Sequence, residues 1–446
     1  MSRLALFACW PYSGHLLPQM AIAGALRARG EEVAFLTGTA ALPTLQDAGM
    51  PATAFRAVDE RAAAAAVGEL ERVAGAGRPS VGDVRRCFDR WLLDTIPGQV
   101  QDLSDAIARR RPDVIVSDVA LWAPMVITAE VTGIQVALAT IFMGPPARGP
   151  GVPPPGLGLP APTSARTRAL SWSVARATDV LAGRMRRRVD DLRAGHGLPP
   201  MGCSINAFMA RAPLTIVPSL RELDYGRPAS PPGVYYVGQC RWQRRARPEA
   251  ARALDELPAD RPSVHVVSTA MEGAEPFLLR AAARGLGGRP LHVVASTGGA
   301  ATPEDLCPSR LPANVHVTEW VDHNHLLPHC AAVVTAGGTG SIVAALAAGV
   351  PLVVVPTAWD KPDNARRVEH AGVGVRLPAR DCTPDRLRRA VRTVLDDPRY
   401  QANARRMARL LAAAPGPTGA ADLVAGLGAE PAPGIVPVQT IQGGVA

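Results

Sequence analysis

The stretch AAVVTAGGTGSIVAALAAGVPLVVVPTAWDKPDNARR, residues 331–367, decides the fold of this chain. An apolar run ends in a glycine-rich turn at 337–340, a helix-like segment follows, and a second apolar run stops at 359–361. Continuous apolar runs that alternate with helical segments are typical of parallel strands covered on both faces. The stretch therefore predicts a strand–turn–helix–strand unit of an α/β protein.

The same alternation occurs in both halves of the chain. Its 446 residues are enough for two domains. Residues 144–166 are too rich in Pro and Gly for a regular element, and residues 241–262 read as a connection between domains. We predict an α/β fold of two Rossmann-like domains that face each other across a cleft. The predicted strands are 3–9, 32–38, 111–118, 134–140, 262–269, 289–297, 314–320, 331–338 and 351–357.

Composition narrows the classes of function. The chain is 47% apolar and 20% charged, which is typical of a globular protein. Its net charge of +9 would suit a protein that binds nucleic acid. Only 4% of residues are aromatic, however, and no nucleic-acid-binding signature is present, which argues against that class. No apolar run reaches the roughly 18 residues of a membrane helix. Seven scattered cysteines without a CxxC pair, and a first segment that reads as a strand rather than a signal peptide, predict a cytoplasmic protein.

The glycine-rich turn predicts an anion site. Ser341 is expected to cap the following helix, whose first N–H groups lack internal partners and attract phosphate. A turn without a ligand stays an alternative. So does an NAD(P)-dependent oxidoreductase, because Gly338 and Gly340 precede Asp360 at the end of the next strand. Val343 stands where that fingerprint needs a third small residue, and the absence of GxxxxGK[ST] excludes a Walker loop. The diphosphate of a sugar nucleotide is the third interpretation.

Two stretches resemble a known family. Residues 311–377, LPANVHVTEW through AGVGVRL, resemble the C-terminal donor-binding signature of GT-B nucleotide-sugar glycosyltransferases, in particular the bacterial natural-product (macrolide and antibiotic) branch. Residues 7–38, FACWPYSGHLLPQMAIAGALRARGEEVAFLTG, are similar to the first strand, loop and helix of that family. The resemblance is weakest over 140–260. It implies an inverting, metal-independent transfer of a sugar from a dTDP- or UDP-sugar to a small apolar natural product.

The resemblance also implies a division of labour. Residues 1–225 would bind the acceptor and residues 226–417 the nucleotide sugar, with a helix near 418–426 returning to the first domain and a flexible tail at 427–446. His15 would be the general base for the acceptor hydroxyl, and Asp118 would orient this histidine and stabilise its charge. Donor-binding residues would be Trp320 against the nucleotide base, Val321 at the base edge, Gly337, Gly338, Thr339, Gly340 and Ser341 at the diphosphate, and Asp360 at the sugar.

Three positions depart from the family pattern. Ala336 replaces a histidine that usually precedes the glycines, Lys361 replaces a glutamine after the sugar-binding acid, and VVSTAM at 266–271 replaces a Gly-Ser turn. We include Lys361, and Ser268 from the last segment, among the expected donor contacts. Because of these departures, a GT-B sugar-nucleotide epimerase and a catalytically silent nucleotide- or partner-binding homologue stay open as alternatives.

The sequence gives a weaker signal for the acceptor site than for the donor site. Trp10, Phe142 and Met143 follow predicted strands and are expected to line the acceptor site, with ordinary core positions as the alternative. We expect no cofactor besides the sugar nucleotide, no nucleic-acid partner and no membrane role, and a homodimer is left open. We expect no metal either. Asp322, His323, His325 and His329 resemble a metal site, but Pro328 disrupts the helix that would put His325 and His329 on one face, and no fourth ligand is suitably spaced.

Overall fold

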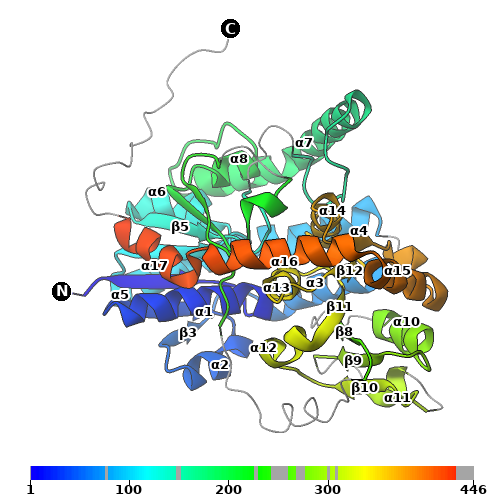
Figure 1. Ribbon diagram of the computed structural model, residues 1–446. Coiled ribbons are helices and arrows are strands. Elements are labelled where there is room, and N and C mark those ends of the chain that lie inside the picture. Colours follow the sequence, from blue (N-terminus) through cyan, green and yellow to red (C-terminus); the bar gives the residue numbers. More distant parts are fainter. Residues whose placement is uncertain are drawn as a thin grey trace.

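The structure is a computed structural model that consists of two α/β lobes, shown in Figure 1. The predicted fold class is confirmed, because parallel strands alternate with helices in both halves of the chain. The structure describes residues 2–75, 79–146, 152–225, 230–242, 260–267, 277–298, 302–306 and 310–427.

The first lobe is built on a parallel sheet with the strand order β3-β2-β1-β4-β5-β6-β7. The strands are β1 Leu4–Ala8, β2 Glu32–Thr37, β3 Ala52–Ala54, β4 Val114–Asp118, β5 Gln135–Ala139, β6 Leu214–Val217 and β7 Val234–Tyr236. The helices are α1 Ser13–Ala28, α2 Leu42–Asp47, α3 Glu60–Gly75, α4 Val81–Phe88, α5 Ile96–Arg110, α6 Ala129–Thr132, α7 Ala165–Ala194 and α8 Ile205–Met209.

The second lobe is built on a parallel sheet with the strand order β10-β9-β8-β11-β12-β13. The strands are β8 Ser263–Val267, β9 His292–Ser296, β10 Val315–Thr318, β11 Cys330–Thr335, β12 Leu352–Val354 and β13 Gly374–Arg376. The helices are α10 Phe277–Leu286, α11 Pro303–Leu306, α12 His323–Leu326, α13 Thr339–Ala347, α14 Lys361–His370, α15 Pro384–Asp396 and α16 Pro398–Ala413, and the last helix, α17 Gly416–Gly426, packs on the first lobe.

Both sheets are covered on both faces. Successive residues of a strand point to opposite sides, so Leu6 of β1 packs in one apolar core of the first lobe and Phe7 in the other. Val333 and Val334 of β11 divide in the same way between the two cores of the second lobe. The continuous apolar runs of the sequence are therefore explained by burial of both strand faces.

The sequence missed short elements and misplaced two helix starts. Strands β3, β6, β7 and β13 have three or four residues each, too few for a recognisable pattern. α1 begins at Ser13, inside the segment PYSGHLLP (11–18) whose Pro and Gly content predicts a turn, so His15 lies in the first turn of a helix. α13 begins at Thr339 after Gly338, and the predicted cap Ser341 is wrong because it lies inside the helix.

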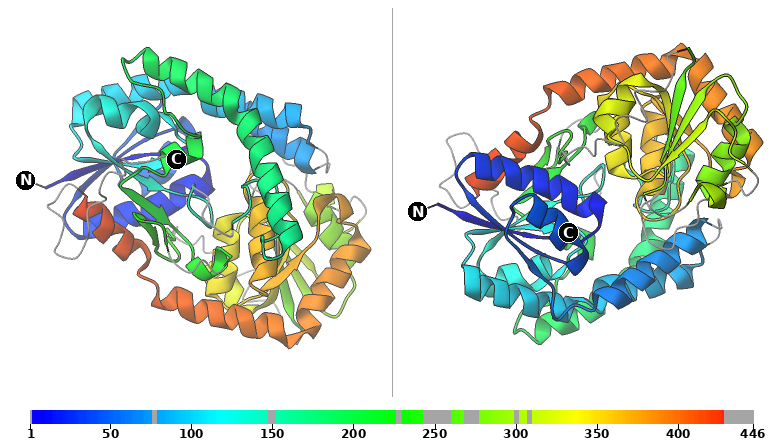
Figure 2. Two further views of the ribbon diagram at one scale, coloured as in Figure 1. Left: turned by 90° about the horizontal axis from the view of Figure 1, so that it is seen from above. Right: turned by 90° about the horizontal axis from the view of Figure 1, so that it is seen from below.

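The chain returns to the first lobe at its C-terminal end. In Figure 2, α16 and α17 run along one side of the molecule from the second lobe to the first. Ala420 and Val424 of α17 are buried in the same apolar core as Ile22 of α1. The domain boundaries drawn from the sequence stay a prediction, and most of the expected connection 241–262 and of the tail 427–446 lies outside the described residues.

The two lobes also contribute to each other's cores. Met143, Leu220 and Leu223 lie in an apolar core of the second lobe, although they follow strands of the first. Ala358 of the second lobe is buried in a core of the first. α7 behaves differently, because it projects from the first lobe (Figure 1) and its Trp172 is 65% exposed. No helix in the described part of the chain is both long enough and apolar enough to cross a membrane.

Candidate active site

His15 and Asp118 meet at the edge of the first sheet. β1 and β4 are neighbours, with Ala8 opposite Ser117, so the loop and helix after β1 lie beside the last residue of β4. His15 Nδ1 is 2.5 Å from Asp118 Oδ2, and the aspartate side chain is fully buried whereas the histidine side chain is 11% exposed. Buried carboxylate and partly exposed imidazole are arranged as in a base and its orienting group.

The backbone holds the Asp118 carboxylate in place. The Ala120 N–H donates to Oδ1 at 2.8 Å and the Trp10 N–H to Oδ2 at 3.4 Å. When His15 donates Nδ1–H to this carboxylate, Nε2 is left as the acceptor of the ring. The pair can therefore take up a proton at Nε2 and stabilise the resulting positive charge.

The glycine-rich turn has one glycine that the fold requires and two that it does not. Gly337 has φ +99°, and a Cβ there would lie 3.0 Å from Val354 Cγ1 and 3.2 Å from Lys361 Cβ. At Gly338 and Gly340 a Cβ would meet no atom within 4 Å among the described residues. Packing within the fold does not require these two glycines, and without a side chain their backbone stays open to close approach.

The start of α13 supplies the polar groups of this turn. In any α-helix the first N–H groups have no intrahelical partner, and here they belong to Thr339, Gly340 and Ser341. They add to the positive end of the helix dipole. The preceding Ala336 is 5% exposed and carries no polar side chain, so the polar groups of the turn are these backbone N–H groups and the Thr339 and Ser341 hydroxyls.

Asp360 is hydrogen-bonded to the same turn. Thr339 Oγ1 donates to Asp360 Oδ2 at 3.1 Å, and Asn364 Nδ2 lies 2.7 Å from the same oxygen. Asn364 Nδ2 also reaches the Gly337 carbonyl at 3.0 Å. Burial raises the pKa of the Asp360 carboxyl above its ordinary value, while the Asn364 bond and the Lys361 charge oppose the shift. Sequence reasoning missed Asn364, although its i, i+4 spacing from Asp360 signals a shared helix face.

Lys361, which is expected among the donor contacts, pairs with a residue of the first lobe in the structure. Its side chain is 8% exposed and its ammonium pairs with Glu71 of α3, in the first lobe. Lys361 Nζ also lies 3.0 Å from Thr357 Oγ1. The lysine thus joins the lobes, and its charge is already neutralised where a contact with the sugar nucleotide was expected.

An aromatic cluster connects the His15–Asp118 pair with the turn that carries Asp360. The Trp91 ring lies 6.3 Å from the His15 ring and 4.9 Å from the Trp359 ring, measured between centroids. Tyr12 adds an edge contact to His15 at 5.5 Å. Trp359 directly precedes Asp360, so the cluster brings the histidine of the first lobe and the turn of the second lobe to one junction. The sequence contained no signal for Trp91, which lies on a segment far from both motifs.

Two of the three apolar residues expected at the acceptor site are core residues. Trp10 is 1% exposed, and its Nε1 donates to the Ala120 carbonyl at 3.1 Å. Met143 is fully buried in a core of the second lobe. Packing within the fold accounts for both side chains, and their place at the acceptor site stays a prediction. Phe142 is half-buried at the margin of a first-lobe core.

Trp320 and Val321, which are expected at the nucleotide base, follow β10, whereas Trp359 of the aromatic cluster follows β12. Trp320 is half-buried, and its carbonyl accepts a bond from Thr318 Oγ1 at 3.0 Å. Val321 is 4% exposed, so only its backbone is suited to contact a ligand. Ser268 lies outside the described residues. Within the described parts of the chain, no group of three or more His, Cys, Asp or Glu is placed to hold a metal ion.

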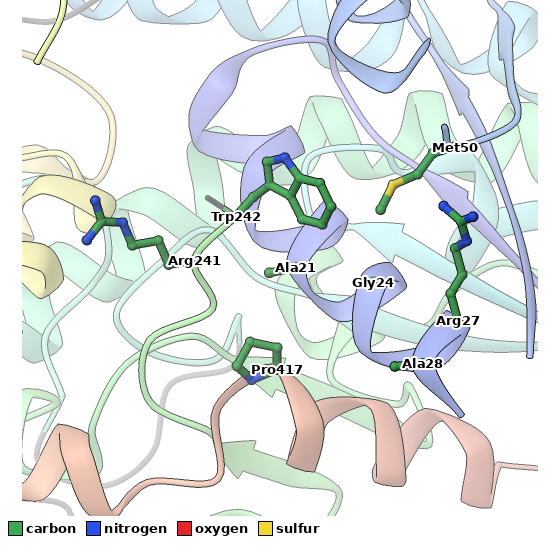
Figure 3. Close-up of a pocket in the computed structure, with 8 residues that line it drawn as sticks. All are labelled: Ala21, Gly24, Arg27, Ala28, Met50, Arg241, Trp242 and Pro417. Atoms are coloured by element: carbon green, nitrogen blue, oxygen red, sulfur yellow. The ribbon is translucent and has the colours of Figure 1, made fainter. Parts of the chain in front are cut away.

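A surface pocket lies elsewhere on α1. Figure 3 shows it along the helix face that carries Ala21 and Gly24, with the Trp242 ring over this face. A Cβ at Gly24 would lie 2.9 Å from Trp242 Cζ3, so the glycine makes room for the indole. Arg241 turns toward the second lobe and pairs with Asp322. None of the predicted site residues lines this pocket, and we do not assign the reaction to it.

Comparison with known proteins settles the family. Residues 299–427 match the family described as erythromycin biosynthesis protein CIII-like, C-terminal domain. The chain is 33% identical over 436 residues to 4'-demethylrebeccamycin synthase of Lentzea aerocolonigenes, covering 96% of this chain and 100% of that protein. The chain belongs to the GT-B natural-product glycosyltransferases.

Solved structures agree on the fold of this glycosyltransferase. The glycosyltransferase of kitacinnamycin matches with a TM-score of 0.70 at 24% identity, over 95% of this chain and 98% of that chain. The glycosyltransferase VinC, solved in complex with dTDP, matches with a TM-score of 0.67 at 21% identity, over 95% and 98% of the two chains. The enzyme is thus a glycosyltransferase of natural-product pathways in both sequence and fold.

Proposed function

We propose that the enzyme transfers a sugar from a dTDP- or UDP-sugar to a hydroxyl group of a small apolar natural product, with inversion at the anomeric carbon. The observation that carries the proposal is the junction at which His15, paired with Asp118, and the turn that holds Asp360 approach each other through Trp91 and Trp359. A base and an anion-binding turn on opposite sides of one junction suit a direct displacement.

In the proposed reaction, His15 Nε2 takes the proton of the acceptor hydroxyl as its oxygen attacks the anomeric carbon. The bond from this carbon to the diphosphate oxygen breaks, so one bond forms as one is lost and the configuration inverts. Asp118 stabilises the imidazolium that results. General-base assistance of this kind contributes about 10²–10⁴-fold to a rate.

The leaving diphosphate is assigned to the start of α13. The N–H groups of Thr339, Gly340 and Ser341 and the helix dipole meet the charge that develops on it. Asp360 is assigned to the sugar hydroxyls, Trp320 and the Val321 backbone to the base, and Phe142 to the acceptor side. The proposal needs neither a metal nor another cofactor. The first lobe with α17 would carry the acceptor, and the second lobe the nucleotide sugar.

The relatives support a nucleotide diphosphate as the leaving group, since VinC was solved with dTDP. The proposal is tested by incubating the enzyme with dTDP-glucose or UDP-glucose and a panel of macrolide and aromatic aglycones, followed by mass spectrometry and NMR of the products. We expect an aglycone that has gained one hexosyl residue, β-linked from an α-linked donor. A retained α-linkage, or binding of NAD or NADP in place of both nucleotides, would contradict the proposal.

A further inference from the structure

Lys361 is the single lysine of a chain in which Lys and Arg together number 48. The lysine side chain is 8% exposed and its partner Glu71 is fully buried, and the two come from different lobes. The other ion pairs of the described residues use arginine or histidine, as in Arg72–Glu69 on the same helix α3 as Glu71. Two buried carboxylates of the first lobe pair with cations of the second, Asp224 with the guanidinium of Arg367 and Glu71 with the compact ammonium of Lys361.

One carboxylate holds both ends of a five-residue turn. Glu71 Oε1 accepts a bond from Lys361 Nζ, and Glu71 Oε2 accepts one from Thr357 Oγ1 at 2.9 Å. Between these two residues lies Trp359, whose φ of +65° is unfavourable for a bulky side chain and persists only where the surroundings impose it. Glu71 is the group that clamps this turn, and the next residue in the turn is Asp360.

The clamped lysine also supports the glycine-rich turn. Gly337 packs on Lys361, with 3.2 Å from its ideal Cβ position to Lys361 Cβ and 3.3 Å to the Lys361 carbonyl. Asn364, one helical turn further along α14, donates to both Gly337 and Asp360. The diphosphate turn, Asp360 and Lys361 therefore form one packed unit, and Glu71 contacts that unit from the acceptor lobe.

We propose that the Glu71–Lys361 pair positions Asp360 and the glycine-rich turn for sugar transfer, so that the donor site is completed by a residue of the opposite lobe. This inference rests on the proposed function. Glu71 acts through Lys361 and Thr357 and is a positioning residue. Misplacement of reacting groups by about 1 Å costs on the order of 10²-fold in rate, so loss of the pair should lower kcat far more than it weakens binding of the nucleotide.

The single lysine permits a direct test of the contact in the wild-type enzyme. An amine-reactive reagent labels only the Lys361 side chain and the chain terminus, and peptide mass spectrometry reports each separately. We expect Lys361 to react much more slowly in the native enzyme than in urea, and more slowly again with dTDP or UDP present. Equal labelling of native and unfolded protein would overturn the proposal without bearing on whether the enzyme transfers sugar.

Steady-state kinetics of variants test whether loss of the Glu71–Lys361 pair lowers kcat. Glu71→Gln and Lys361→Met should each lower kcat by about 10–10²-fold, while the affinity for dTDP and UDP, measured by calorimetry, falls by a much smaller factor. The exchange Glu71→Lys with Lys361→Glu should recover part of kcat, which a merely structural loss would not. Glu69→Gln is the matched control, because its carboxylate lies on α3 but is 59% exposed. Wild-type kcat in Glu71→Gln would overturn the proposal, whereas an inactive wild-type enzyme would instead refute the proposed function.

Discussion

Trp91 and Trp359 come from opposite lobes and meet edge to face, with ring centroids 4.9 Å apart and ring planes at 72°. Trp91 also touches the His15 ring, so a single indole separates the proposed base from the turn that carries Asp360. The Nε1 groups of both tryptophans are buried and have no hydrogen-bond partner among the described residues. The junction is thus held by ring contacts rather than by polar bonds of these side chains.

Truncating the two rings should have unequal effects. Trp91 is 7% exposed and belongs to the first-lobe core, so Trp91→Ala should destabilise the protein by about 3–5 kcal/mol. Trp359 packs at the margin of that core, and Trp359→Ala should lower the melting temperature less while still reducing sugar transfer. Calorimetric melting of both variants checks this order, and a larger loss for Trp359→Ala would show that the packing is misjudged.

Removal of the base should separate chemistry from binding. His15→Ala should lower kcat by about 10²–10⁴-fold, because no other group of the junction is hydrogen-bonded to Asp118 as a base would be. Affinity for dTDP or UDP should be unchanged, since the histidine lies in the other lobe from the glycine-rich turn. His196→Ala, an exposed histidine in the same lobe, serves as the control. Full activity in His15→Ala would remove the imidazole from the mechanism.

Asp360 should illustrate a conflict between stability and function. Burial raises the pKa of this carboxyl, so at a pH above that value the folded protein carries a charge that the unfolded chain solvates better. The folded state then binds the proton more tightly, and this group's contribution to stability falls as the pH rises through the window between the two pKa values. Asp360→Asn removes that cost and keeps an oxygen for Asn364 and Thr339.

We therefore expect Asp360→Asn to melt at a higher temperature than wild type at about pH 8, with a smaller gain at a pH low enough to protonate the buried carboxyl. Transfer should drop in the same variant, because a neutral amide is a weaker acceptor for sugar hydroxyls than a carboxylate. Scanning calorimetry at both pH values and a transfer assay check the two halves. A variant less stable at every pH would mean that the carboxylate is stabilised by its neighbours despite its burial.

The strands and the His15–Asp118 pair could be predicted from the sequence for one reason. Parallel strands place their carboxyl ends at a common edge, so residues that follow β1 and end β4 meet even though they are far apart in the chain. The family resemblance then attached chemistry to that edge. Helix starts were less accessible, since Gly338 precedes the first turn of α13 without any side-chain cap and Ser341 was chosen on side-chain chemistry alone.

Contacts between the lobes could not be predicted from the sequence. Glu71 and Lys361 are 290 positions apart, and α3 carries other acidic residues, such as the exposed Glu69, with the same local pattern. The helical spacing of acidic residues on α3 does not show which of their carboxylates the second lobe will bury. The burial of Trp10 was inaccessible for a related reason: an apolar residue after a strand suits a ligand site and a core equally, and only the structure shows its indole N–H donating to the Ala120 carbonyl.

The central claim, that the glycine-rich turn binds the diphosphate of a sugar nucleotide, is tested most directly by titrating dTDP and UDP into wild type and Gly340→Val by calorimetry. A Cβ at Gly340 would meet no atom within 4 Å among the described residues, so we expect the variant to stay folded. We expect wild type to bind one or both nucleotides, and the variant to bind at least about tenfold more weakly, a loss of about 1.4 kcal/mol. Gly426→Val, at an equally open position of α17, should bind like wild type. Equal affinity in Gly340→Val and wild type would contradict the account.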